Sequence, residues 1–270
     1  MFPSQLRRQA LFAAALVAAG TAPLAAQNAS RPGESEFRWS GVAGGDHLRI
    51  NNISGDISVT ATEGDRVELV ATLHGDGPDS EVRVEVKEHA GGVTICTLYG
   101  DDAYCDADGA RQERQLGWGR SQRGHYDLQV RVPRRMRITA GSVSGDVRVN
   151  GATAQLRATS VSGDVTLERI RAAGALEATS VSGDVQARME AVEANTDLEL
   201  KSVSGDVSVS MPRTTGFDLD MSTVSGDLVS DFALQMQGRF NRRHVRARAN
   251  DGGADIRVST VSGDVRLANN

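Results

Sequence analysis

Seven aspartates recur in one short motif, and they are the residues of this chain whose spacing could support chemistry. Clustered carboxylates are ligands that calcium prefers, and carboxylates at turns also accept hydrogen bonds from backbone N–H groups. Each of these aspartates follows Ser-Gly and precedes an aliphatic residue. The Gly-Asp pairs are Gly55 and Asp56, Gly145 and Asp146, Gly163 and Asp164, Gly183 and Asp184, Gly205 and Asp206, Gly226 and Asp227, and Gly263 and Asp264.

The two interpretations of these aspartates differ in what offsets charge repulsion. If successive copies stack as neighbouring strands, carboxylates about 4.8 Å apart repel by about 0.9 kcal/mol per pair in water. Calcium-binding β-rolls offset this repulsion with a metal, but they carry aspartates much more densely than one per about 20 residues. We therefore expect each carboxylate to accept N–H groups at its own turn, and we expect no metal or other cofactor.

The only two cysteines, Cys96 and Cys105, are nine positions apart. A local disulfide is the expected state in an oxidising compartment, and closing so short a loop stabilises the fold by roughly 2.5–3 kcal/mol on the chain-entropy model. Zinc binding is the alternative. Two thiols without a second pair or a histidine cluster make an incomplete zinc site, and the five histidines are scattered along the chain.

Aromatic residues mark one candidate contact region. Trp118 and Tyr104 lie in a polar, glycine-rich insertion, residues 100–124, which we expect to be structureless. Aromatic rings can stack on sugars or anchor an interface, and they can equally cover an open end of a repeat fold. Both interpretations remain open from the sequence.

A basic patch, residues 239–248, marks a second candidate contact region and includes Arg242 and Arg243. It could bind anionic polymers of a cell envelope. Alternatively, it forms a solvated loop that pairs with nearby acids such as Asp251 and Asp255.

Catalytic motifs are missing from the sequence. It contains no Gly-x-Ser-x-Gly elbow, phosphate-binding loop or His-Glu-x-x-His helix. Paired carboxylates on a β-helix can cleave glycosides, but here the acids recur alike at every turn, which indicates geometry rather than one site. The formal net charge of −5 gives no reason to expect nucleic acid. We therefore predict that the chain is not an enzyme and has no nucleic-acid partner.

A repeated pair of short β-strands must position the aspartates. From Ser144 onward the intervals between Ser-Gly-Asp copies are 18, 20, 22, 21 and 37 residues, and 37 is close to two periods with a degenerate copy between them. Leu176 and Ala178 share one alternating phase, whereas Val185 and Ala187 share the other. Since successive side chains of a strand point to opposite faces, the chain must turn a corner near its Gly-Asp pair.

Two all-β architectures fit this unit. In a parallel β-solenoid each unit of about 20 residues is one coil, and equivalent strands stack. In an antiparallel β-meander the Gly-Asp pair is a two-residue hairpin turn. Near-identical units that cannot bury their own apolar face favour the solenoid. We expect residues 133–270 to form about seven regular coils, and residues 41–132 to form an N-terminal β-strand part of the same solenoid.

The first 26 residues have the features of an export signal: a basic start, an apolar run at residues 10–20 and small residues before a cleavage point near Ala26. Eleven apolar residues are too few to cross a bilayer, which needs about 20. We therefore expect cleavage, a linker at residues 27–40 and no transmembrane anchor in the mature chain. The mature chain would lie in the periplasm, on the outer-membrane surface or outside the cell.

The repeat resembles the bacterial exported "putative adhesin" domain of unknown function. The resemblance covers roughly residues 40–270. It rests on YDLQVRVPRRMRITAGSVSGDVRVNG at residues 126–151, on the serial TSVSGDV copies and on the closing DGGADIRVSTVSGDVRL. It implies a single-stranded, right-handed β-helix-like fold and a place in the cell envelope, and it brings no catalytic residues to transfer.

Together these features predict an exported, non-enzymatic module with a structural, adhesive or interaction role in the cell envelope. Its partner would be an envelope protein or a glycan. Two alternatives stay open from the sequence: an exported carbohydrate-active enzyme built on a β-helix, and an accessory sensor in envelope-stress signalling.

Overall fold

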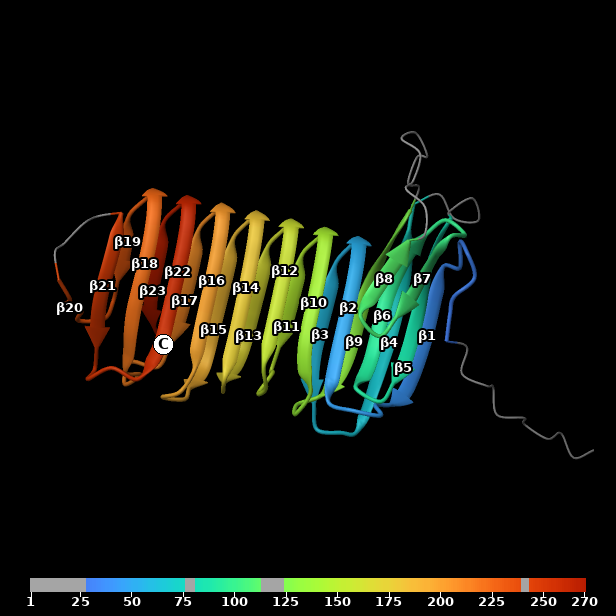
Figure 1. The fold of residues 1–270 in the computed structure, drawn as a ribbon, viewed down its shortest axis with the longest axis horizontal. Helices are drawn as coiled ribbons and strands as arrows, with labels where there is room; N and C mark the ends of the chain where they lie inside the picture. Colours follow the sequence, from blue (N-terminus) through green and yellow to red (C-terminus); the bar gives the residue numbers. More distant parts are fainter. Residues whose placement is uncertain (1–27, 76–80, 113–123, 239–242) are drawn as a thin grey trace, which may run out of the picture.

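The computed structural model describes residues 28–75, 81–112, 124–238 and 243–270, and in these residues the chain is all-β, without a helix. Two large sheets face each other along an elongated stack, and a small two-stranded sheet lies beside one end (Figure 1). None of the described residues belongs to a helix that could span a bilayer. The predicted export signal, residues 1–26, lies outside the described residues.

The 11-stranded sheet is called sheet A and the 10-stranded sheet is called sheet B. The strands of sheet A, in spatial order, are β20 (Gln235–Met236), β21 (His244–Ala249), β18 (Phe217–Ser225), β22 (Ala254–Ser262), β16 (Asp197–Ser204), β14 (Ala175–Ser182), β12 (Leu156–Ser162), β10 (Arg137–Ser144), β2 (His47–Ser54), β6 (Gly92–Tyr99) and β5 (Val82–His89). Those of sheet B are β1 (Glu36–Val42), β4 (Arg66–His74), β9 (His125–Pro133), β3 (Ile57–Thr62), β11 (Val147–Asn150), β13 (Val165–Ala172), β15 (Val185–Val192), β17 (Val207–Met211), β23 (Val265–Asn269) and β19 (Leu228–Ser230). The small hairpin is β7 (Ala103–Asp106) and β8 (Gly109–Gln112).

Each repeat supplies one strand to each sheet, and the two strands meet at a Ser-Gly-Asp corner. In the repeat of β14 and β15, Leu176 is buried in the core before the corner and Val185 after it. Gly183 adopts a φ of 154°, and a Cβ atom there would lie 2.3 Å from the carbonyl oxygen of Gly163 in the neighbouring coil. The change of phase in the sequence therefore corresponds to a corner that excludes side chains.

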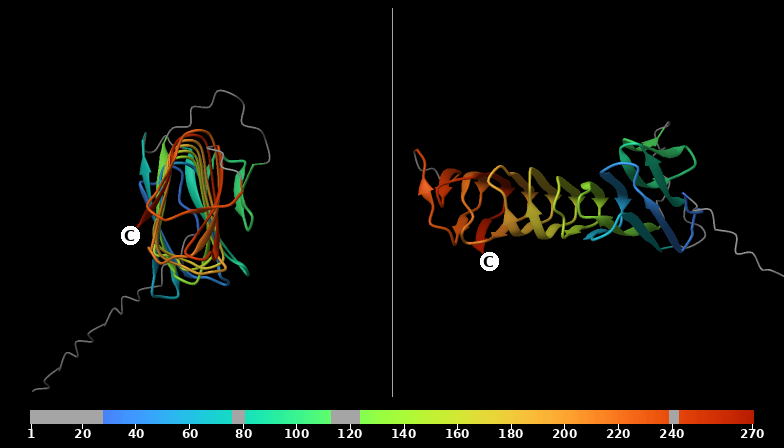
Figure 2. Two further views of the ribbon diagram at one scale, coloured as in Figure 1. Left: turned by 90° about the vertical axis from the view of Figure 1, so that its left-hand side faces the viewer. Right: turned by 90° about the horizontal axis from the view of Figure 1, so that it is seen from below.

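Equivalent residues of successive coils are neighbours in parallel register. Leu156 pairs with Leu176 and Leu176 with Leu198 in sheet A, while Val165 pairs with Val185 in sheet B. Seen end-on, the coils superimpose (Figure 2). The antiparallel meander is therefore wrong for the repeats. Both sheets are nevertheless mixed, because the pairs β1–β4 and β4–β9 in sheet B and β5–β6, β18–β21 and β20–β21 in sheet A are antiparallel.

At the C-terminal end, the order of coils along the stack departs from the order in the chain. Strand β22 pairs with β16 on one side and with β18 on the other, so Ile256 lies between Leu198 and Leu219 in one apolar row. The predicted degenerate copy in the 37-residue interval is wrong, since the described residues there form β19, β20 and β21. Residues 133–270 consequently contain six Ser-Gly-Asp coils rather than about seven.

The N-terminal part belongs to the same stack. The coil of β2 and β3 pairs in parallel with β10 and β11, and the chain between them extends both sheets through β4, β5, β6 and β9. Phe37 and Trp39 of β1 are buried, and the Ser30 N–H donates to the Val84 carbonyl at 2.9 Å. Residues 28–40 of the expected linker are therefore part of the fold, because their apolar side chains cover the end of the core.

One hydrophobic core runs between the two sheets. Its aromatic side chains lie near the ends of the stack: Phe37, Trp39, Tyr99 and Tyr126 at the N-terminal end, and Phe217 and Phe232 at the C-terminal end. The rings of Phe217 and Phe232 meet edge to face, with centroids 5.2 Å apart. The coils between are filled mainly by aliphatic side chains, which suit a narrow interior.

Candidate functional site

The repeat aspartates form a continuous hydrogen-bonded column along one corner of the stack. In each coil the Oδ1 atom of the aspartate accepts the backbone N–H of the aspartate in the next coil, as Asp164 does from Asp184 at 2.8 Å. The N···O distances are 2.7–2.9 Å, and the column runs through Asp127, Asp56, Asp146, Asp164, Asp184, Asp206, Asp264 and Asp227 in spatial order. The prediction that each carboxylate accepts N–H groups from its own turn is wrong, because parallel register places every turn directly beside the next.

Several interactions offset the repulsion between the carboxylates of this column. Each N–H from the next coil offsets part of the carboxylate repulsion, and water screens more of it because the side chains are partly exposed. Arg148 also pairs with Asp56 and Asp146, at 3.2 and 2.5 Å. Across the described ranges, no three or more His, Cys, Asp or Glu side chains are grouped so as to hold a metal ion.

A second column consists of buried hydroxyl groups. In five coils a Ser or Thr hydroxyl donates to the corner glycine carbonyl of the preceding coil at 2.8–3.2 Å; the donors are Ser142, Ser160, Ser180, Ser202 and Thr260. In the last coil the buried Thr223 hydroxyl has no partner among the residues that the structure describes. These hydroxyls bind neighbouring coils together and do not face a ligand.

Six exposed valines form a column that the alternating pattern of the sequence does not predict. Val181 shares the sequence phase of Val185, yet Val181 is exposed and Val185 is buried, because the corner lies between them. The equivalent side chains are 40–61% exposed in six coils: Val143, Val161, Val181, Val203, Val261 and Val224. Their position directly after the buried hydroxyl is the only sequence signal that could have identified them.

The two cysteines join a hairpin to the outer face of sheet A. Cys96 of β6 is bonded to Cys105 of β7, with Cα atoms 5.8 Å apart. Strand β6 is buried on both faces because the hairpin of β7 and β8 covers the outer one, where Leu98 and Ala103 pack with the two cysteines. Residues 103–112 of the expected structureless insertion are therefore ordered β-structure.

Two side chains of β5, which the sequence analysis missed, hold this hairpin in place. Glu85 Oε2 accepts the Cys105 N–H at 3.0 Å, and Arg83 donates to the carbonyl oxygens of Gly100 and Ala103. Arg83 and Glu85 also pair with each other at 3.2 Å, and both are largely buried. A charged pair that satisfies three backbone groups of a hairpin orients it more strongly than a surface ion pair.

The predicted contact residues do not come together. Tyr104 is 45% exposed on β7 near the N-terminal end, whereas Arg243 directly precedes β21 at the other end (Figure 1). Trp118 and Arg242 lie outside the described residues. Tyr99 is buried, and burial raises its pKa to about 12, so it belongs to the core and not to a contact surface.

The described part of the basic patch is paired with acids of β18. Arg246 contacts Asp220 at 3.2 Å and Arg248 contacts Asp218 at 2.7 Å. The hydrogen bond from Arg248 is the main cause of a lowered pKa of Asp218. The expected partners, Asp251 and Asp255, are wrong for these two arginines, because antiparallel pairing places β21 beside β18.

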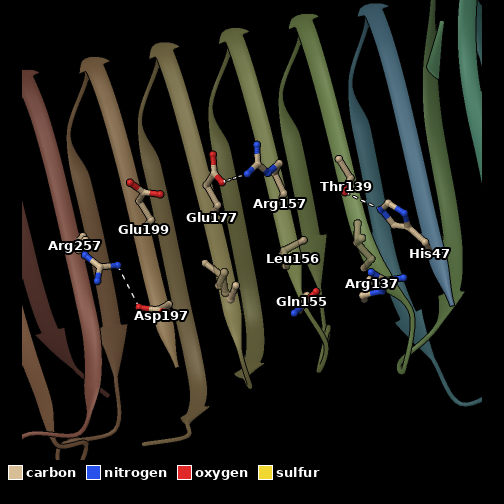
Figure 3. Close-up of a pocket in the computed structure, with 13 residues that line it drawn as sticks. His47, Arg137, Thr139, Gln155, Leu156, Arg157, Glu177, Asp197, Glu199 and Arg257 are labelled. Carbon is tan, nitrogen blue, oxygen red and sulfur yellow. Dashed lines mark hydrogen bonds and ion pairs between the residues drawn. The ribbon is translucent and has the colours of Figure 1, made fainter. Parts of the chain in front are cut away.

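A shallow groove of about 440 Å³ crosses the outer face of sheet A (Figure 3). Its lining comes from β2, β10, β12, β14, β16 and β22, so it runs along the stack across six neighbouring strands. Basic and neutral side chains, including His47 and Arg137, lie at one end, and the acids Asp197 and Glu199 lie towards the other (Figure 3).

Contacts between strands order the side chains of the groove. Arg157 pairs with Glu177 at 2.6 Å, and His47 Nε2 lies 2.9 Å from Thr139 Oγ1. Burial lowers the pKa of His47, and the positive charges of Arg49 and Arg137 lower it further. The groove therefore has an organised polar surface.

The comparisons with known proteins concern the fold. The Toastrack DUF4097 family matches residues 35–196 and 172–268. A crystal structure of a "putative cell adhesion protein" from Clostridium sporogenes is similar at 8% identity and a TM-score of 0.47, over 87% of this chain and 100% of that one. A crystal structure of a "putative adhesin" from Bacteroides fragilis is similar at 14% identity and a TM-score of 0.45, over 87% of this chain and 98% of that one.

Neither crystal structure is close enough to carry an argument about function. None of the curated proteins matches the chain. The family match, by contrast, extends over both the N-terminal strands and the repeats. This chain belongs to the Toastrack DUF4097 family.

Proposed function

We propose that this chain is an exported, non-enzymatic interaction module of the cell envelope that binds a glycan or an envelope protein through the outer face of sheet A. The groove is the observation that carries the proposal. Six neighbouring strands present charged and polar side chains there, in rows spaced by about 4.8 Å. Stacked repeats create extended surfaces of this kind, which suit an elongated partner.

The acids of the groove support binding rather than catalysis. Glu177 and Glu199 are register neighbours on β14 and β16 and are the pair that a glycosidase would use. Glu177 contacts Arg157, and Glu199 contacts Lys201. A general acid needs an apolar environment instead, so this pair lacks the asymmetry that glycoside cleavage requires.

The proposal includes export and a winding direction. The disulfide supports an oxidising compartment, and residues 1–26 carry the features of an export signal. The mature chain is assigned to the periplasm, the outer-membrane surface or the extracellular space. Its coils are assigned to a right-handed, single-stranded parallel solenoid, which the parallel register of the repeats supports.

Glycan arrays and envelope polysaccharide fractions test this function, with mass spectrometry of the bound material to detect turnover. The paired variant R157A/E177A removes an ion pair from the groove. Its matched control, R188A/E168A, removes an exposed ion pair of 3.0 Å from the outer face of sheet B. We expect saturable binding without turnover, weakened by the first variant and unchanged by the second.

Two results would contradict the proposal. Turnover of a polysaccharide that disappears in Glu177→Gln would establish the carbohydrate-active enzyme instead. Binding that is lost in R188A/E168A and kept in R157A/E177A would place the binding surface on sheet B.

A further inference from the structure

Arg49 lies at the boundary between the groove and the disulfide hairpin. On β2 it alternates with core residues such as Leu48, so its side chain is on the outer face of sheet A. Its register partners are Thr139, which lines the groove, and Thr94. Thr94 is buried, and its hydroxyl donates to the Ala107 carbonyl of the hairpin at 3.1 Å.

The Arg49 guanidinium has no hydrogen-bond acceptor or ion-pair partner in the part of the chain that the structure describes. Its Nε atom is buried without a partner. Acids in the adjoining segments are already occupied, since Asp46 pairs with Arg137 at 2.8 Å and Asp106 pairs with Arg111 at 3.0 Å. The protein itself covers Nε, so an external anion would reach the other guanidinium N–H groups, which carboxylate, sulfate or phosphate oxygens satisfy best.

The two arginines that line this end of the groove are paired with acids, whereas Arg49 beside them is not paired with any acid of the described residues. Arg137 is offset by Asp46, and Arg157 is offset by its partner on β14, which leaves Arg49 unbalanced. His47 responds to the same field. Burial lowers the pKa of His47 most, Arg49, Arg137 and His89 lower it further, and Asp46 raises it.

We propose that Arg49 binds an anionic group of an acidic polysaccharide whose chain continues along the groove. This inference rests on the proposed function and adds the ligand class and the residue that recognises it. Arginine binds carboxylate, sulfate and phosphate oxygens through two parallel hydrogen bonds. From His47, two residues before Arg49 on β2, the groove extends across β10, β12, β14, β16 and β22, a path that suits a linear polymer better than a compact lipid headgroup.

Calorimetric titration of the folded chain with a polyuronate oligosaccharide tests the site at low ionic strength. We expect Arg49→Ala to weaken binding at least about tenfold, because a charge-assisted hydrogen-bonded pair is lost. Arg49→Lys should give a smaller loss, since lysine keeps the charge without the planar fork. The control Arg188→Ala on sheet B should bind like the parent, and thermal melting checks that each variant is folded.

A second measurement separates ligand contact from a structural role of Arg49. The pKa of the His47 imidazole, followed by NMR, should rise when the oligosaccharide binds, because the anion offsets the charges of Arg49 and Arg137. If polyuronate binds tightly but this pKa stays constant, the anion does not lie at Arg49.

The remaining outcomes distinguish a failure of the Arg49 site from a failure of the proposed function. Equal binding of a neutral oligosaccharide, unaffected by Arg49→Ala, would refute the anion site and leave the interaction module in place. Failure of every glycan, polymer and envelope-protein fraction to bind would refute both. Binding to vesicles with anionic lipids, but not to polyuronate, would refute the polysaccharide as the ligand.

Discussion

The middle of the stack and its two ends are stabilised by different interactions. From β10 to β17, each strand pairs in parallel with its equivalents, and the aspartate column adds one hydrogen bond per coil. At the N-terminal end of both sheets and at the C-terminal end of sheet A, antiparallel strands replace the parallel ones, and the aromatic residues of the core are concentrated at the two ends of the stack. The N-terminal end also carries the disulfide hairpin.

This difference shows how a repeat of this kind stops. A parallel coil exposes unpaired backbone groups and apolar side chains on its free side, so identical coils alone would continue to add neighbours. Here β5 and β21 cover the strand edges, while Phe37 and Phe232 close the core. The repeats therefore supply length, and the unlike ends limit it.

The largest effect is expected at a corner in the middle. Gly183→Val should destabilise the fold by about 3 kcal/mol or more, because its Cβ would lie 2.3 Å from a backbone oxygen at a φ of 154°. Chemical denaturation measures the loss. Gly64→Ala is the matched control, with open space around its Cβ. An unchanged midpoint for Gly183→Val would mean that the corner can relax.

Removal of the disulfide tests whether an end is independent of the middle. The variant C96A/C105A should lose roughly 2.5 kcal/mol of local stability through the released loop. Hydrogen exchange should accelerate in β5 to β8 and remain slow in β12 to β17. Equal acceleration in both regions would show that the ends and the middle unfold as one unit.

The stability that the aspartate column provides should depend on its hydrogen-bond acceptors and not on its negative charge. Asp184→Ala removes the acceptor of the Asp206 N–H, with an expected cost of about 1–2 kcal/mol. Asp184→Asn retains an oxygen acceptor and should cost less than Asp184→Ala. Added calcium should leave the melting temperature unchanged, and a large increase would instead indicate a cation along the column.

The smallest effect concerns pH at the N-terminal end. Burial, followed by Arg49 and Arg137, lowers the pKa of His47 in the folded state. The unfolded state therefore binds more protons than the folded state as the pH falls. The contribution of His47 to the free energy of unfolding is present above its ordinary pKa of about 6.5. It is lost as the pH falls through the pKa that His47 has in the folded state. Parent and His47→Gln should diverge in melting temperature below that pH. A constant difference between pH 8 and 5 would contradict the assignment.

Local features of this fold were predictable, whereas contacts between distant segments were not. The phase change around Gly183 and the nine-residue spacing of Cys96 and Cys105 both depend on short segments. The exposed Val181 was missed because alternation cannot locate a corner to the residue. The pair of Arg83 and Glu85 was missed because its partners lie in a hairpin about 20 residues away.

The amino-acid sequence by itself determined the unit: two short strands, a corner that only glycine fits, and one aspartate per coil, since these depend on side-chain alternation and backbone sterics within about 20 residues. Only the tertiary structure decided which coil neighbours which. Near-identical edges compete for the same partners, and in the folded chain β22 lies between β16 and β18 while β21 pairs with the other edge of β18. The tertiary structure also decides that Arg49 lies beside the hairpin without an acid partner among the described residues, since its neighbours come from strands far apart in the chain.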